Sequence, residues 1–206
     1  MPNSHYKNEA MNTIYDMLFC DQPILYKNGQ TQWQYPWNFL FEETLNVEAI
    51  EKITQDLTLE SRPKILAYNK LFKGGVKPPK KELLGIIIEV HLEEGLDVLA
   101  AYRDGTARYI NHSEKLIIWD TTTEQSNQLV KKLFAEGEQV IEKIGPWEDP
   151  RLPCPPPGDV RLTFLVSDGL YFGQGPIDVL FNDPMGAPTL QAATMLMQHL
   201  TENNQP

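Results

Sequence analysis

Three polar side chains would meet in one row if the strands that carry them pair as their turn sequences predict. Asp104-Gly105 is a frequent two-residue hairpin turn, and pairing across it places Asp97 opposite His112. A three-residue loop over Glu93-Glu94-Gly95, with the glycine in the left-handed position, places His91 opposite Asp97. The sequence therefore predicts a row of His91, Asp97 and His112 across three neighbouring strands, on one face of a sheet.

A row of this composition suits two kinds of chemistry. Opposed Cβ atoms lie about 4.5–5.5 Å apart, so the carboxylate would contact both imidazoles. Histidine and carboxylate groups bind metal ions, and a carboxylate that raises a histidine pKa makes an acid–base pair. The alternative without chemistry is a row of surface ion pairs, since opposite charges are frequent on neighbouring strands.

A second candidate site is a basic segment at residues 61–81, which holds seven basic residues and no acidic one. Because the whole chain carries a net charge of −10, this segment stands out as a candidate anion-binding or partner-docking surface. The alternative is a solvated surface that lies against the acidic remainder of the protein. Its basic residues are Arg62, Lys64, Lys70, Lys73, Lys77, Lys80 and Lys81.

Most motifs that identify a catalytic or cofactor site do not occur in the sequence. There is no phosphate-binding loop, no His-Glu-x-x-His, no Cys-x-x-Cys and no Gly-x-Ser-x-Gly. Gly173-Gln174-Gly175 is too short for a dinucleotide fingerprint, and we expect a bulge or bend there. Ser167, next to Asp168, is expected to be a turn serine. The cofactor and any metal therefore stay unknown.

The strands that must position the row are predicted by alternating apolar residues between Gly85 and Asp120. Four consecutive strands are expected there, followed by a helix from about Thr123 to Ile144 with an apolar stripe. The C-terminal part has the same order, with a strand from Val160, two short strands at 170–172 and 177–181, and a helix over 189–200. The four strands of the first group are expected at residues 86–93, 96–103, 106–112 and 116–119.

The N-terminal part is predicted to be helical and extended. We expect a helix over residues 8–19 and an extended segment with one aromatic face over residues 33–41. Two further helices should begin at the caps Asn46 and Ser61, the second ending at Gly74-Gly75.

These elements predict an α+β fold. It consists of an antiparallel β-meander sheet of about six or seven strands, with helices packed mainly on one face, plus an N-terminal helical segment. Residues 1–82 are expected to pack on a main domain of residues 83–206, which contains a proline-rich connection at 146–158. That connection holds six of the sixteen prolines, so it reads as a stiff surface linker, with Pro153-x-x-Pro156 as a candidate SH3-type ligand.

The composition of the chain indicates the cellular location and the kinds of partner to expect for the protein. Two distant cysteines and the absence of a signal-like N-terminus or a long apolar run favour a cytoplasmic protein without membrane segments. The net charge of −10 argues against nucleic acid, because phosphate binding needs a positive footprint. Another protein or a second copy of the chain is the expected partner.

Three hypotheses about function follow. The first is a non-enzymatic protein-binding or assembly module that uses the sheet surface or the proline segment. The second is a small-molecule enzyme, such as a metal-assisted hydrolase, centred on His91, Asp97 and His112. The third is a binder of anionic ligands that uses the basic segment at residues 61–81.

Overall fold

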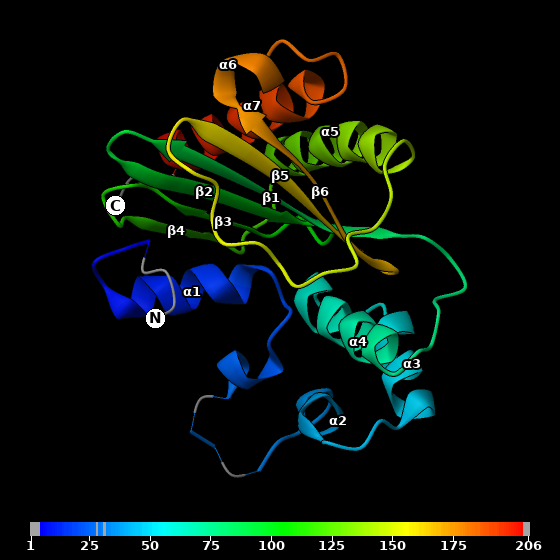
Figure 1. The fold of residues 1–206 in the computed structure, drawn as a ribbon. Helices are drawn as coiled ribbons and strands as arrows, with labels where there is room; N and C mark the ends of the chain where they lie inside the picture. The colour runs from blue at the N-terminus through cyan, green and yellow to red at the C-terminus, as the bar shows by residue number, and fades with distance from the viewer. Residues whose placement is uncertain (1–4, 28, 31, 204–206) are drawn as a thin grey trace.

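In the part of the chain that the structure describes, six antiparallel strands form one sheet in the spatial order β4-β3-β2-β1-β5-β6 (Figure 1). The structure is a computed structural model and describes residues 5–27, 29–30 and 32–203. The predicted α+β class with an antiparallel meander is confirmed. The strands are β1 (Leu83–Leu92), β2 (Gly95–Tyr102), β3 (Ala107–Ile110), β4 (Leu116–Trp119), β5 (Asp159–Val166) and β6 (Gly169–Pro176).

Helices precede and follow the strands of the sheet. The predicted cap at Asn46 is confirmed, because its Oδ1 accepts the backbone N–H of Ala49 at 3.1 Å. The helices are α1 (Glu9–Leu18), the 3-10 helix η1 (Pro23–Tyr26), α2 (Trp37–Phe41), α3 (Val47–Gln55), α4 (Ser61–Lys73), α5 (Glu124–Ile141), α6 (Ile177–Leu180) and α7 (Ala187–Asn203).

The C-terminal helices pack on one face of the sheet. Side chains alternate between the two faces of a strand, so Ile86, Ile88 and Leu99 share this face. They belong to one hydrophobic core with Phe134 of α5 and Leu196 of α7. Figure 1 shows α5 and α7 lying together above the sheet.

The N-terminal helices cover the opposite face. Ile87 of β1 and Val98 of β2 belong to a second core with Leu18 of α1, Ile53 of α3 and Leu66 of α4. In Figure 1, α1 and α4 lie below the sheet, on the side away from α5. The sequence placed the helices mainly on one face of the sheet, and in the structure helices pack on both faces.

Two segments that the sequence predicts as extended are partly helical. Trp37 and Phe41 stack with 5.5 Å between ring centroids because they stand four residues apart on α2. Residues 177–181 were expected to be a strand, but Ile177–Leu180 forms α6, whose last turn closes when the Phe181 N–H donates to the Ile177 carbonyl. Short apolar runs do not distinguish a strand from a single helical turn.

The segment Gly173-Gln174-Gly175 was expected to be a bulge or bend, and it is a regular part of β6. Its residues pair continuously with β5, Leu162 opposite Gly173 and Arg161 opposite Gln174. The Gln174 side chain accepts two hydrogen bonds from the Arg161 guanidinium, at 2.9 and 2.6 Å. This side-chain pairing holds a glycine-rich strand in register.

The proline-rich connection is fixed along the sheet by backbone hydrogen bonds at both ends. The Trp147 N–H donates to the Leu170 carbonyl and the Gly158 N–H donates to the His91 carbonyl, each at 2.7 Å. Within it Pro155 is buried, whereas Pro153 and Pro156 are exposed. The segment is therefore an ordered surface strap.

Candidate functional site

The predicted row of His91, Asp97 and His112 does not form, because two hairpin loops differ in length from the expectation. The β1–β2 loop has two residues, Glu93 and Glu94, where three were expected, and Leu92 pairs with Gly95. Val90 therefore stands opposite Asp97, and His91 stands opposite Leu96. A shift of one residue turns a side chain to the other face, so His91 and Asp97 lie on opposite faces of the sheet.

The β2–β3 loop differs in the opposite direction. It has three residues, Arg103 to Gly105, because Tyr102 and Thr106 close it through a 2.9 Å backbone hydrogen bond. Gly105, at φ +91°, takes the left-handed position that ends a three-residue hairpin loop. Val98 then pairs with Ile110, and the predicted cross-strand pairing of Asp97 with His112 is wrong.

Asp97 nevertheless contacts His112 through its side chain. Its Oδ1 accepts the His112 backbone N–H at 2.7 Å and lies 3.0 Å from His112 Nδ1. Its Oδ2 accepts the hydroxyl of Tyr109 at 2.7 Å. The Asp97 carboxylate is thus held from both sides, while His112 remains half-exposed at the start of the β3–β4 turn.

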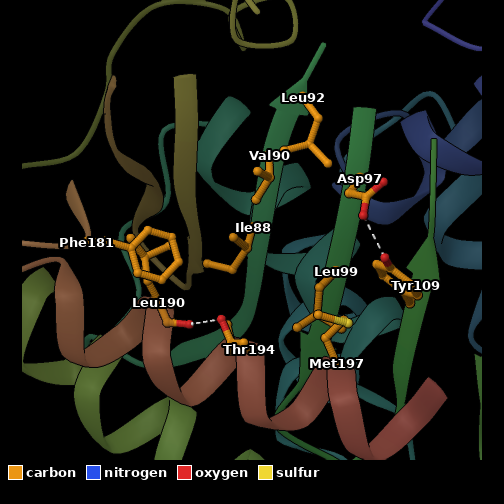
Figure 2. A pocket seen from close by; sticks show the side chains of 11 residues that line it. Ile88, Val90, Leu92, Asp97, Leu99, Tyr109, Phe181, Leu190, Thr194 and Met197 are labelled. Carbon is orange, nitrogen blue, oxygen red and sulfur yellow. Dashed lines mark hydrogen bonds between the residues drawn. The ribbon is translucent and has the colours of Figure 1, made fainter. Parts of the chain in front are cut away.

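An apolar pocket of about 240 Å³ lies next to Asp97, between the sheet and α7 (Figure 2). Its walls come from the C-terminal-helix face of β1, β2 and β3, from α7, and from Phe181 at the end of α6. Figure 2 shows the side chains of β1 opposite those of α7, with the Asp97–Tyr109 hydrogen bond at one side. The lining residues are Ile88, Val90, Leu92, Asp97, Leu99, Tyr109, Phe181, Leu190, Ala193, Thr194 and Met197.

The polar groups of this pocket are few and well placed. Asp97 carries the only charged side chain among the described residues that line it. Burial and the hydrogen bond to Asp97 raise the pKa of Tyr109, so its hydroxyl stays neutral and acts as a donor to the carboxylate. An apolar pocket with a small number of fixed polar groups is the usual form of a small-molecule site.

Sequence reasoning placed Asp97 among the candidate residues but missed the pocket. Tyr109 shares a face with Leu99, its partner across β2 and β3, and the one-residue shift hid this relation. Phe181 was assigned to a strand, and Met197 was not singled out within the predicted helix over residues 189–200. The registers of β1 with β2 and of β2 with β3 were both needed to find the pocket.

His91 lies on the other side of the sheet and has a structural contact. Its Nδ1 is 2.7 Å from the Pro155 carbonyl, and its own carbonyl accepts the Gly158 N–H. His91 therefore holds the proline-rich strap against β1.

The seven basic residues of the second candidate site do not gather in one place. Arg62 lines one hollow, Lys70 and Lys73 line another, and Lys80 and Lys81 line a third. Each hollow also contains carboxylates, which disfavour an anion. These are Asp120 in the first, Asp21, Glu42 and Glu43 in the second, and Glu82, Glu138 and Glu142 in the third.

Several of these cations have partners within the fold. The Lys70 ammonium donates to the carbonyls of Phe39 and Glu42 at the end of α2, at 2.8 and 2.5 Å. The Lys81 ammonium donates to the Ile141 carbonyl, the last residue of α5, at 2.6 Å. Cations at helix C-termini offset the negative end of the helix dipole.

The remaining basic residues have separate surroundings. Arg62 pairs with Glu60 at 2.7 Å, and the Lys73 ammonium lies 3.3 Å from the Asp21 carbonyl. Lys77 and Lys80 are exposed, and Lys64 is half-buried. The arrangement favours a structural role for the segment over a joint anion site.

A buried ion pair that the sequence did not reveal lies on the N-terminal-helix face. Glu89 of β1 is fully buried, its Oε1 accepts the Tyr15 hydroxyl at 2.6 Å, and its Oε2 lies 3.7 Å from Arg161 Nη1. Burial raises the pKa of Glu89, and this cause outweighs the opposite effects of Tyr15 and Arg161. The pair links α1 to β1 and β5, and an apolar strand sequence gave little sign of it.

The two cysteines are not candidate nucleophiles. Both are free thiols, Cys20 buried and Cys154 half-buried. Burial raises the pKa of Cys20 to about 12 and that of Cys154 to about 11, so both stay protonated near neutral pH.

A metal-assisted mechanism finds no support in the geometry. Among the described residues, no three His, Cys, Asp or Glu side chains lie together as a metal-binding group. Within the same ranges, no helix combines the length and the apolar character that a bilayer crossing requires.

No protein-family model matches the chain, and no curated protein matches it. The site must therefore be interpreted from its own chemistry.

Proposed function

We propose that the protein binds a small, mainly apolar molecule in the pocket between the sheet and α7. The observation that carries this proposal is the combination of apolar walls with one fixed carboxylate at Asp97. The pocket, at about 240 Å³, is larger than the ~150 Å³ apolar cavities that accommodate benzene. A ligand with roughly eight non-hydrogen atoms is therefore of suitable size.

The surroundings support binding of a ligand from solution. Phe181, at the edge of the pocket, is partly exposed, and Thr194 on α7 is half-buried. The Thr194 hydroxyl donates to the Leu190 carbonyl within α7, so its proton already has an acceptor in its own helix. A ligand would replace water along the apolar wall and gain about 25 cal/mol for each Å² removed from water.

The test is binding of 1-hexanol to two variants of α7. Thr194→Phe would fill the pocket, whereas Gln198→Phe adds the same ring on an exposed position one helical turn further on. Calorimetry or ligand-observed NMR should show hexanol binding to the wild type and to Gln198→Phe, with at least a roughly tenfold weaker affinity for Thr194→Phe. Equal affinities for the two variants, or no binding to the wild type, would contradict the proposal.

The enzyme hypothesis is less well supported than binding. The Asp97–His112 contact resembles half of an acid–base arrangement, since the carboxylate lies 3.0 Å from one imidazole nitrogen. His112, however, does not line the pocket, and its backbone N–H already ties Asp97 to the β3–β4 turn. A group that cannot reach the ligand is a poor proton donor or acceptor.

A protein-binding role is the second proposal, and its support comes from exposed apolar side chains on and after α6 and on α7. Val179, Phe181 and Met185 follow one another on and after α6, and Met195 lies on α7. Their exposed fractions range from 36% to 56%. Such a group is a common feature of interaction surfaces. Concentration-dependent light scattering would show whether this surface joins two copies of the chain.

A further inference from the structure

The chemistry of the pocket narrows the class of its ligand. Asp97 is the one charged residue among the described side chains that line it, and the other lining groups are apolar except for Tyr109 and Thr194. A ligand carboxylate would be repelled by the negative charge of Asp97, while a cation would meet its counter-ion. We infer that the ligand is a primary amine with an apolar body, whose ammonium group binds Asp97. This inference rests on the proposed function.

The Asp97 carboxylate has a free acceptor position for such a group. A carboxylate offers about four acceptor positions. Oδ1 of Asp97 is engaged by the His112 backbone N–H and by His112 Nδ1, whereas within the described ranges Oδ2 receives a single donor, the Tyr109 hydroxyl. The second acceptor position on Oδ2 is therefore available to a ligand.

Tyr109 supplies a second acceptor next to the first. Its hydroxyl donates its proton to Asp97 Oδ2 at 2.7 Å, which leaves the phenolic oxygen able to accept a hydrogen bond. An ammonium group carries three donors and can bind Asp97 Oδ2 and Tyr109 Oη together. A hydroxyl has one donor and no charge, so an alcohol of equal length makes fewer and weaker hydrogen bonds to the same two acceptors.

The whole molecule also favours a cation. The chain carries a net charge of −10, which raises the local concentration of cations and lowers that of anions near the surface. The carboxylate itself is fixed by three protein hydrogen bonds, so little side-chain entropy is lost when the ligand binds.

The experiment compares three probes of the same length: n-hexylamine, 1-hexanol and hexanoate. Their affinities are measured by calorimetry near neutral pH for the wild type, Asp97→Asn, Tyr109→Phe and Asp168→Asn. Asp168 is the matched control, because it also accepts a tyrosine hydroxyl, that of Tyr171 at 3.1 Å, but does not line the pocket. Thermal unfolding of each variant shows whether it folds.

The expected result is a preference of at least roughly tenfold for hexylamine over hexanol in the wild type, about 1.4 kcal/mol, with hexanoate weakest. Asp97→Asn should remove this preference while hexanol still binds, Tyr109→Phe should reduce it, and Asp168→Asn should leave it unchanged. If Asp97→Asn does not fold, the wild-type comparison and Tyr109→Phe decide the question.

Two results separate this inference from the proposed function. If hexanol binds but hexylamine binds no better, or if hexanoate binds best, the ammonium assignment is wrong and the pocket remains a ligand site. A preference for hexylamine that survives in Asp97→Asn, or that Asp168→Asn abolishes, also overturns the assignment. If none of the three probes binds, the proposed function itself fails.

Discussion

The junction between helix α4 and the β2–β3 loop provides a quantitative test of how this fold is held together. The sequence predicts Ser61 as the cap of α4, but the cap comes from a residue 43 positions later: Asp104 Oδ2 accepts the Ser61 N–H at 2.6 Å. The Ser61 hydroxyl accepts the Asp104 N–H in return, at 3.1 Å. Two reciprocal hydrogen bonds therefore join the N-terminal helices to the sheet.

Replacement of Asp104 by alanine removes more than this cap. Asp104 Oδ1 also accepts the backbone N–H and the hydroxyl of Thr106, at 2.9 and 2.7 Å. A hydrogen bond to a charged group contributes about 1.5–3 kcal/mol when buried, and a helix cap about 1 kcal/mol. Because Asp104 is only half-buried and water replaces part of the loss, we expect Asp104→Ala to cost roughly 2–4 kcal/mol and Ser61→Ala about 1 kcal/mol.

Asp56 is a matched control for the local part of this interaction. Its Oδ1 accepts the N–H and the hydroxyl of Thr58, at 2.8 and 2.6 Å, in the pattern that Asp104 makes with Thr106. Its other oxygen accepts the exposed Tyr35 hydroxyl at 2.8 Å, and among the described residues Asp56 accepts no N–H from the first turn of α4, so Asp56→Ala should destabilise the protein less than Asp104→Ala.

The assay is urea unfolding of both single variants, the double variant Ser61→Ala/Asp104→Ala and Asp56→Ala, compared at equal m-values. The reciprocal pair predicts that the double variant is less destabilised than the two single variants together, by roughly 0.5–1 kcal/mol. Strict additivity, or equal losses for Asp104→Ala and Asp56→Ala, would refute the reasoning.

Two further predictions concern the two cores. Because the pKa of Glu89 is raised, the folded protein binds more protons than the unfolded chain. Wild-type stability should therefore fall as pH rises from the ordinary value of 4.5 through the folded pKa. Glu89→Gln should flatten this dependence of the unfolding free energy on pH. An unchanged slope in the pH-dependent unfolding curves would argue against it. Gly137→Ala on α5 should lower the melting temperature, because a Cβ there would lie 2.7 Å from Ile86 Cδ1 and 3.2 Å from Phe164 Cε1. The overpacking cost of about 1–3 kcal/mol should exceed the helix-propensity gain of about 1 kcal/mol, and Gln139→Ala on the exposed side of α5 is the control.

Elements with a clear periodicity could be predicted from the sequence. The apolar residues Ile86, Ile88, Val90 and Leu92 at every second position identified β1, and the apolar stripe of α5 identified its length to within a few residues. The segment around Phe181 could not be assigned, because five residues of which four are apolar fit a strand and a single helical turn equally well.

An error of one residue in the length of each hairpin loop changed which side chains were predicted to lie together in the candidate site. Both hairpins contain a glycine with positive φ, Gly95 at +138° and Gly105 at +91°, so both sequences allow a two-residue or a three-residue loop. Gly105 ends a three-residue loop, in which Asp104 is engaged by Ser61 and Thr106. That contact comes from tertiary structure and has no signal in the local sequence.

The register of β1 and β2 decides which face of the sheet carries Asp97. In the predicted register, Asp97 would share a face with His91 and Glu89, beneath the N-terminal helices. In the observed register it shares a face with Val90 and Ile88, beside α7. A second hairpin supports the two-residue loop as a recurring solution in this sheet, since Val166 pairs with Gly169, at φ +139°, in the same way that Leu92 pairs with Gly95. One residue of register therefore moves Asp97, the only carboxylate of the described pocket lining, from one face of the sheet to the other, and the proposed ligand site depends on that position.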